Sequence, residues 1–212
     1  MFRRSQAAFL GLFLVIANAS GARADSLYEA SSAGDVQVVR RLIAEGAEVN
    51  LTYRYDTPLH AAAATGQVEV AKLLIAAGAD VNAHSFLGTP LDAAASGGHL
   101  AVVQLLVANG ADVNARNGYD NISLHFAAES GNVDVAKALL AAGADLNARN
   151  KMGSSPLMRA AEAGNTEVAL LLIAAGADVT YRDSCHQAAL DIAEARRDSV
   201  LAQHLLAVGA GE

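Results

Sequence analysis

The chain repeats itself at a nearly fixed interval, and this feature limits its fold more than any other. One marker is a leucine that recurs at intervals of 32, 32, 33, 33 and 33 residues, at Leu27, Leu59, Leu91, Leu124, Leu157 and Leu190. A second marker keeps the same intervals, at Gly46, Gly78, Gly110, Gly143, Gly176 and Gly209. Two markers in phase indicate six copies of one unit, which start near residues 25, 57, 89, 122, 155 and 188. Such copies predict a linear stack in which each unit packs on its neighbours.

Each unit carries start and stop signals for two helices. The first helix begins at a hydroxyl residue followed by proline, as in Thr57-Pro58 and Ser155-Pro156. The hydroxyl caps a free backbone N–H, and proline has no N–H to leave unpaired. This helix is rich in alanine and ends at a glycine, at Gly34, Gly66, Gly97-Gly98, Gly131 and Gly164. The second helix ends at a sequence of the type Gly-Ala-Asp-Val-Asn, where glycine adopts the left-handed conformation.

These residues resemble a known family. The segment Thr57-Pro58-Leu59-His60-Ala61-Ala62 and the 33-residue period are similar to those of ankyrin repeat proteins. The resemblance covers residues 25–212, taken as one ankyrin-repeat domain. It implies an all-α repeat solenoid of stacked helix-turn-helix units, with projecting β-hairpin fingers that line a concave face. It also implies that the imidazoles of His60 and His125 bond around the helix starts.

The first 24 residues have the composition of a signal peptide. Arg3 and Arg4 precede an apolar stretch over residues 7–17, and small residues follow. Two cleavage sites are left open, after Ala24 and after Ala19. We therefore expect export by the general secretory route and a periplasmic location, with secretion as the alternative. An uncleaved anchor is disfavoured because the apolar stretch is short for a bilayer.

The charge of the chain without this segment excludes several kinds of partner. Residues 25–212 hold 12 basic and 22 acidic side chains. This negative charge repels phosphate backbones and anionic lipid, so we expect no binding to nucleic acid. The longest apolar run after residue 25 spans residues 168–177, half of what a membrane-spanning helix needs. We expect no membrane insertion after signal cleavage, and a monomer.

Motifs for catalysis, cofactors and metals were sought and not found. The sequence has no HExxH, GxSxG or phosphate-binding glycine loop, so we predict no catalytic residue, no cofactor and no metal site. His60 and His125 share a repeat position with Asp92 between them, but stacked helices lie about 8–10 Å apart, too far for shared metal ligation. The four aspartates that follow Gly-Ala, one per unit, favour a turn role over calcium: Asp80, Asp112, Asp145 and Asp178.

The only cysteine gives an alternative function. Cys185 lies beside His186 and near Arg182, neighbours that favour a thiolate. A thiol-based redox or enzymatic role therefore stays open. An ordinary finger residue is favoured, since no second cysteine is present to resolve a disulfide.

The connections between units, or fingers, hold the clearest functional signal. They span residues 51–56, 83–88, 115–121, 148–154 and 181–187, and contain five of the seven aromatic residues of the mature chain. Aromatic residues at loop tips have little core to bury them and are enriched at binding hot spots. The fingers hold five basic residues against three acids, which favours a protein partner that presents acidic or polar groups.

We therefore predict a non-catalytic protein-binding module whose partner contacts the finger tips and the concave face. Phe126 and Arg159 extend the contact set onto the first helices, where small residues such as Ala64, Ala93 and Ser96 leave room for a partner. The predicted partner-binding residues are Tyr53, Arg54, Tyr55, Phe86, Arg116, Tyr119, Phe126, Arg149, Lys151, Arg159, Tyr181 and Arg182. Two alternatives remain: a secreted effector that acts on a host protein, and finger aromatics that pack on one another to stiffen the row.

Overall fold

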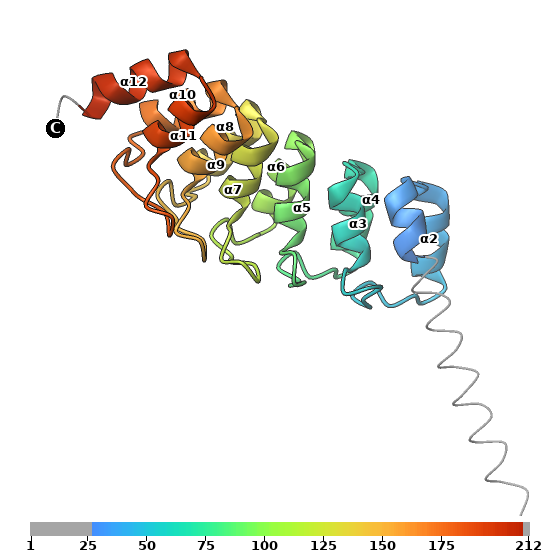
Figure 1. Ribbon diagram of the computed structural model, residues 1–212. Coiled ribbons are helices and arrows are strands. Elements are labelled where there is room, and N and C mark those ends of the chain that lie inside the picture. Colours follow the sequence, from blue (N-terminus) through green and yellow to red (C-terminus); the bar gives the residue numbers. More distant parts are fainter. Residues whose placement is uncertain (1–26, 210–212) are drawn as a thin grey trace, which may run out of the picture.

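The computed structural model describes residues 27–209, and these residues form a curved stack of helix pairs (Figure 1). Residues 27–33 are helical, and the pairs continue from α2 (Val36–Ala44) to α12 (Ser199–Gly209). The expected all-α repeat solenoid is confirmed. The predicted signal peptide, residues 1–24, and its two cleavage sites lie outside the described residues.

The helices lie in two rows. After residues 27–33, the inner row contains α3 (Pro58–Ala64), α5 (Pro90–Gly97), α7 (Ser123–Ser130), α9 (Pro156–Ala163) and α11 (Ala189–Ala195). The outer row contains α2, α4 (Val68–Ala76), α6 (Leu100–Ala108), α8 (Val133–Ala141), α10 (Thr166–Ala174) and α12. Each helix contacts the next helix of its own row, so the core runs the length of the stack. No helix within residues 27–209 combines the length and the apolarity needed to cross a membrane.

The two sequence markers have separate structural roles. Five of the six marker leucines are fully buried between the rows, from Leu27 to Leu157, whereas Leu190 at the C-terminal end is partly exposed. The marker glycines end the outer helices, and those from Gly46 to Gly176 have φ between +84° and +90°. Only glycine adopts this region without strain, which explains why the second marker does not vary.

The inner helices begin with reciprocal caps that also join neighbouring units. The Thr57 backbone N–H donates to Nδ1 of His60 at 3.1 Å, so Nε2 carries the proton and donates to the Gly88 carbonyl at 3.2 Å. His125 repeats this arrangement, with its Nε2 3.2 Å from the Ser154 carbonyl. The bonding implied for both imidazoles by the family resemblance is therefore present.

An asparagine ladder joins successive units along the loops below the outer helices. Asn50 Nδ2 donates to the Gly78 carbonyl at 3.0 Å, and its Oδ1 accepts the Asp80 backbone N–H at 2.8 Å. Asn82 and Asn114 make the same pair of bonds to the unit that follows each of them. The Gly-Ala-Asp-Val-Asn sequence thus supplies one half of each joint, and the next copy supplies the other half.

The fingers are tight turns and not β-hairpins. Within residues 27–209 the only β pairing is an isolated bridge between Tyr53 and Asp56. The first two fingers close through reciprocal backbone hydrogen bonds, between Tyr53 and Asp56 and between Ser85 and Gly88. The prediction of projecting fingers is confirmed, and within residues 27–209 the expected β-hairpins are present only as turns, one of which contains a β-bridge.

Candidate functional site

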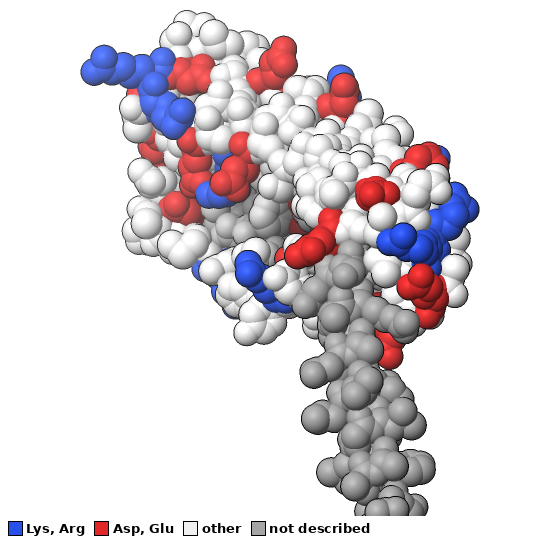
Figure 2. Space-filling model, turned by 90° about the vertical axis from the view of Figure 1, so that its right-hand side faces the viewer, with Lys and Arg blue, Asp and Glu red and all other residues white. Residues whose placement is uncertain are grey.

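The fingers project from one side of the helix rows and, with the inner helices, form the concave face (Figure 1). Side chains on this face come from two sources, the turns and the exposed side of the inner row. Figure 2 views the molecule from its N-terminal end, where charged side chains form separate groups with uncharged surface between them. The contacts of individual side chains on the concave face are described next.

Large apolar side chains are exposed along the turns. They are Tyr55 (81% exposed), Phe86 (60%), Leu87 (66%), Tyr119 (51%) and Met152 (59%), here called the finger-tip strip. Sequence reasoning found the three aromatic members and missed Leu87 and Met152, because it searched the fingers for aromatic and charged residues only. Any large apolar residue at a turn position would have been the signal.

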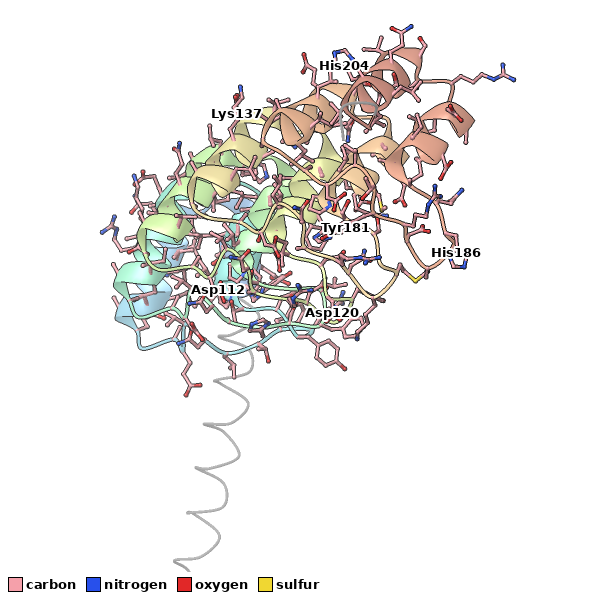
Figure 3. The ribbon with its side chains drawn as sticks, turned by 90° about the vertical axis from the view of Figure 1, so that its left-hand side faces the viewer. Asp112, Asp120, Lys137, Tyr181, His186 and His204 are labelled. Carbon is pink, nitrogen blue, oxygen red and sulfur yellow. The ribbon has the colours of Figure 1, made fainter. Side chains whose placement is uncertain are left out.

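The other predicted aromatics lie behind the strip. Tyr53 is partly buried, and its ring centroid lies 5.1 Å from that of Tyr28. Tyr181 is also partly buried, and the Cζ atom of Arg149 lies over its ring, 5.0 Å from the ring centroid. Figure 3 shows Tyr181 closer to the helices than Asp120 and His186, which mark the outer ends of their fingers. Tyr53 and Tyr181 thus support the fingers from within.

Three of the predicted arginines bond to finger backbones. Arg116 donates to the Asp120 carbonyl of its own finger and to the Arg149 carbonyl of the next finger, at 3.2 and 2.8 Å. Arg149 makes the equivalent bonds to the carbonyls of Gly153 and Arg182. Arg182 donates to the His186 carbonyl at 2.7 Å and pairs with Asp191 at 2.9 Å. These guanidinium groups hold the fingers in register.

The remaining predicted cations are also engaged. Lys151 Nζ donates to the Gly118 carbonyl at 2.7 Å, and Arg54 lies over the Tyr53 ring. Arg159 lies between Glu129 and Glu162, with both ion-pair distances at 2.6 Å. Burial acts to lower the pKa of Arg159, but the two carboxylates outweigh it and the pKa is raised.

Backbone bonds link the second to fifth fingers into a row. Gly118 N–H donates to the Phe86 carbonyl at 3.2 Å, and the rings of Phe86 and Tyr119 meet edge to face at 5.1 Å. Lys151 N–H donates to Tyr119, and Ser184 N–H donates to Met152. The stiffening role that the sequence left open is therefore present for Phe86 and Tyr119, although both rings stay more than half exposed.

A central pocket of about 340 Å³ opens between the first three fingers and the inner helices. Ala64, Ala93 and Ser96 line it, where small residues were expected to leave room. Its other lining residues are Tyr28, Asp56, His60, Ser85, Leu87, Gly88, Thr89, Asp92, Asn117, Tyr119, Asn121 and Phe126. Neither lysine nor arginine is among them, so the charged groups at its wall are carboxylates.

Asp92 is the buried carboxylate of this pocket. It is 2% exposed, and its two oxygens accept the Thr89 backbone N–H at 2.8 Å and the Ser123 hydroxyl at 2.6 Å. Burial raises its pKa, while these hydrogen bonds act in the opposite direction. His60 holds the equivalent position one unit earlier, and burial lowers its pKa, so this imidazole adds no positive charge near neutral pH.

The residues considered for chemistry in the sequence lie apart from one another or in turns. Cys185 is exposed, and within residues 27–209 no hydrogen bond joins its thiol to His186. In the same part of the chain, no group of three or more His, Cys, Asp or Glu side chains is placed to hold a metal ion. Asp112 and Asp145 each accept the backbone N–H two residues later, which is the turn role expected for them.

Comparison with known protein families adds an independent finding. A family model described as ankyrin repeats (3 copies) matches residues 27–117 and again residues 117–183. Together the two matches cover most of the chain and end before α11, and Arg197, where the earlier units have glycine, lies beyond them. No curated protein matches the sequence.

Proposed function

The chain belongs to the ankyrin repeat family, and from this premise we propose that it is a non-catalytic module that binds a protein partner through its concave face. Ankyrin repeats generally mediate protein–protein interaction. We also propose that the chain contains six repeats, one for each helix pair, and that the terminal pairs act as caps. The partly exposed Leu190 in the last pair supports a capping role.

The finger-tip strip is the observation that carries this proposal. Its five apolar side chains are each more than half exposed, so they contribute little to folding. They lie on the first four turns, and backbone bonds and arginines hold the second to fifth turns in register. A row that is already ordered loses little conformational entropy when a partner binds, which favours affinity. Large apolar and aromatic groups on such a surface are typical binding anchors.

The proposed location is the periplasm, with secretion as the alternative. The basic, apolar and small-residue regions of residues 1–24 support export. Expression of the full chain with a C-terminal tag, followed by cell fractionation, tests this location. A product in the periplasmic fraction, shortened by 19 or 24 residues, is expected, whereas a full-length cytoplasmic product would refute export.

A pair of surface variants tests the binding role. In the strip variant, Tyr55, Phe86 and Met152 are replaced by serine. In the matched control, Val200 and Leu206 of α12 are replaced by serine, because these residues are similarly exposed outside the concave face. Each protein is cross-linked in a periplasmic extract, and the captured proteins are quantified by mass spectrometry.

We expect the strip variant to lose the partner that the wild type and the control variant retain, while all three keep the same helical circular dichroism. Equal capture by the strip variant would contradict the assignment of the concave face. Loss of capture by the control alone would place the binding surface at the C-terminal end of the stack.

A further inference from the structure

We propose that the central pocket receives a lysine or arginine side chain of the protein partner. This inference rests on the proposed function and specifies the chemistry that the partner presents. It also reverses the expectation of an acidic partner that the basic residues of the fingers had suggested. Three features of the concave face support it: the pocket carboxylates, the engagement of the local cations, and the aromatic walls.

The first feature is the pair of carboxylates at the pocket wall. Asp56 comes from the first finger and Asp92 from α5. Within residues 27–209 the Asp56 carboxylate has no ion pair, and no hydrogen bond is made to it. The buried oxygens of Asp92 each accept one hydrogen bond, which leaves acceptor capacity on both. A cation in the pocket therefore meets two negatively charged carboxylates that can accept its hydrogen bonds.

The second feature is that nearby cations do not compete for these carboxylates. Arg54, in the same finger as Asp56, lies over the Tyr53 ring and forms no ion pair with Asp56 among the described residues. Arg116 and Arg149 donate to finger carbonyls, and Arg159 is held between two glutamates. The positive composition of the fingers thus does not give a positive pocket. Electrostatic complementarity at the pocket itself favours a basic partner over an acidic one.

The third feature is the size and lining of the pocket. Tyr28, Tyr119 and Phe126 line it, and aromatic faces attract ammonium and guanidinium groups. Ser85 Oγ also lines it and is buried without a hydrogen-bond partner among the described residues, which leaves an acceptor for a donor of the partner. A volume of about 340 Å³ is near the lower end of ligand pockets, roughly 300–1,000 Å³, and suits one long side chain.

Selection from a random peptide library tests the proposal without knowledge of the natural partner. Dodecapeptides displayed on phage are selected on the immobilised protein, and the affinity of each enriched peptide is measured in solution. Each peptide is then measured against Asp56→Asn and Asp92→Asn. Asp134→Asn on the outer helix α8 is the charge-matched control, because its exposed side chain lies far from the concave face. Asp56→Asn is the decisive variant for binding, because the Asp56 carboxylate makes no contact that the fold needs and its replacement should not disturb folding.

We expect the enriched peptides to share a lysine or arginine at one position. Replacing that residue by norleucine, and introducing Asp56→Asn, should each weaken binding by about tenfold, because a hydrogen bond to a charged group is lost. Asp134→Asn should leave affinity unchanged.

Two other results are informative in different ways. Peptides that depend on the finger-tip strip but share no basic residue would overturn the pocket assignment and leave the proposed function standing. Failure to enrich any peptide would count against the proposed function, and the pocket assignment would fall with it.

Discussion

Tyr55 combines a strained backbone with an exposed side chain, and its replacement by glycine should affect stability and binding in opposite directions. Arg54 and Tyr55 have φ of +50° and +80° at the centre of the first finger. Two consecutive positive values define a turn that prefers Asn-Gly, since a larger L-residue there costs about 1–2 kcal/mol. The Tyr55 side chain is 81% exposed, so the little apolar surface that it buries does not offset this strain.

The magnitude follows from two opposing contributions. Tyr55→Gly removes the left-handed strain of about 1–2 kcal/mol. Glycine also gives the unfolded chain more freedom, which costs about 0.5–1 kcal/mol. The free energy of unfolding should therefore rise by about 0.5–1 kcal/mol. Binding should weaken by about 2 kcal/mol, roughly thirty-fold, if Tyr55 is an anchor of the finger-tip strip.

Urea unfolding followed by circular dichroism measures the first effect, and peptide or partner affinity measures the second. Tyr55→Ala is the matched control, because it removes the same side chain but keeps the positive φ unfavourable. It should bind as weakly as Tyr55→Gly without the gain in stability. A loss of more than about 1 kcal/mol in Tyr55→Gly would show that the ring supports the fold, and unchanged affinity would refute its role as an anchor.

Three further predictions address the fold. Burial lowers the pKa of His125 to about 4, against 6.5 in the unfolded chain. The free energy of unfolding should therefore be unaffected by His125 above pH 6.5 and fall by about 3 kcal/mol as the pH drops to 4, and His125→Gln should flatten this dependence on pH. A urea midpoint that does not change between pH 6.5 and pH 4 would contradict this prediction. Arg149→Lys should lower stability by about 1 kcal/mol because lysine lacks the planar guanidinium that donates from two separate nitrogens to the carbonyls of Gly153 and Arg182, whereas Arg54→Lys should change little in the same unfolding assay. Arg197 has φ of +61° where the earlier units have glycine, so Arg197→Gly should raise the free energy of unfolding by about 1 kcal/mol and the thermal midpoint with it. An unchanged thermal midpoint would show that the backbone at Arg197 is not strained.

The fold could be predicted because its determinants are local and repeated. The Thr57-Pro58 start, the helix-ending glycines and the marker leucines each act within one unit or between adjacent units. Even the departure at Arg197 was visible, since a glycine position occupied by another residue indicates an end unit. The β-hairpins of the fingers were expected only from the resemblance, and in the structure the fingers are turns with one β-bridge among the described residues.

The functional site was only partly predictable because charge counts do not reveal hydrogen-bond partners. The sequence identified Arg116 and Arg149 as finger residues, but only the spacing of adjacent fingers shows that their guanidinium groups reach carbonyls of the next finger. Leu87 and Met152 were missed because an apolar residue in a loop is not informative until its exposure is known. Asp56 and Asp92 are 36 residues apart in sequence, and only the stack brings them to one pocket.

The asparagine ladder makes three successive joints chemically the same. Asn50, Asn82 and Asn114 each reach only the adjoining loop, so no joint depends on how many others exist. Duplication or deletion of one of the copies that these asparagines join would therefore leave the same pair of asparagine bonds at the new junction. A gene of this kind can lengthen or shorten the surface it offers by one module at a time, and can alter turn residues independently of the scaffold that carries them.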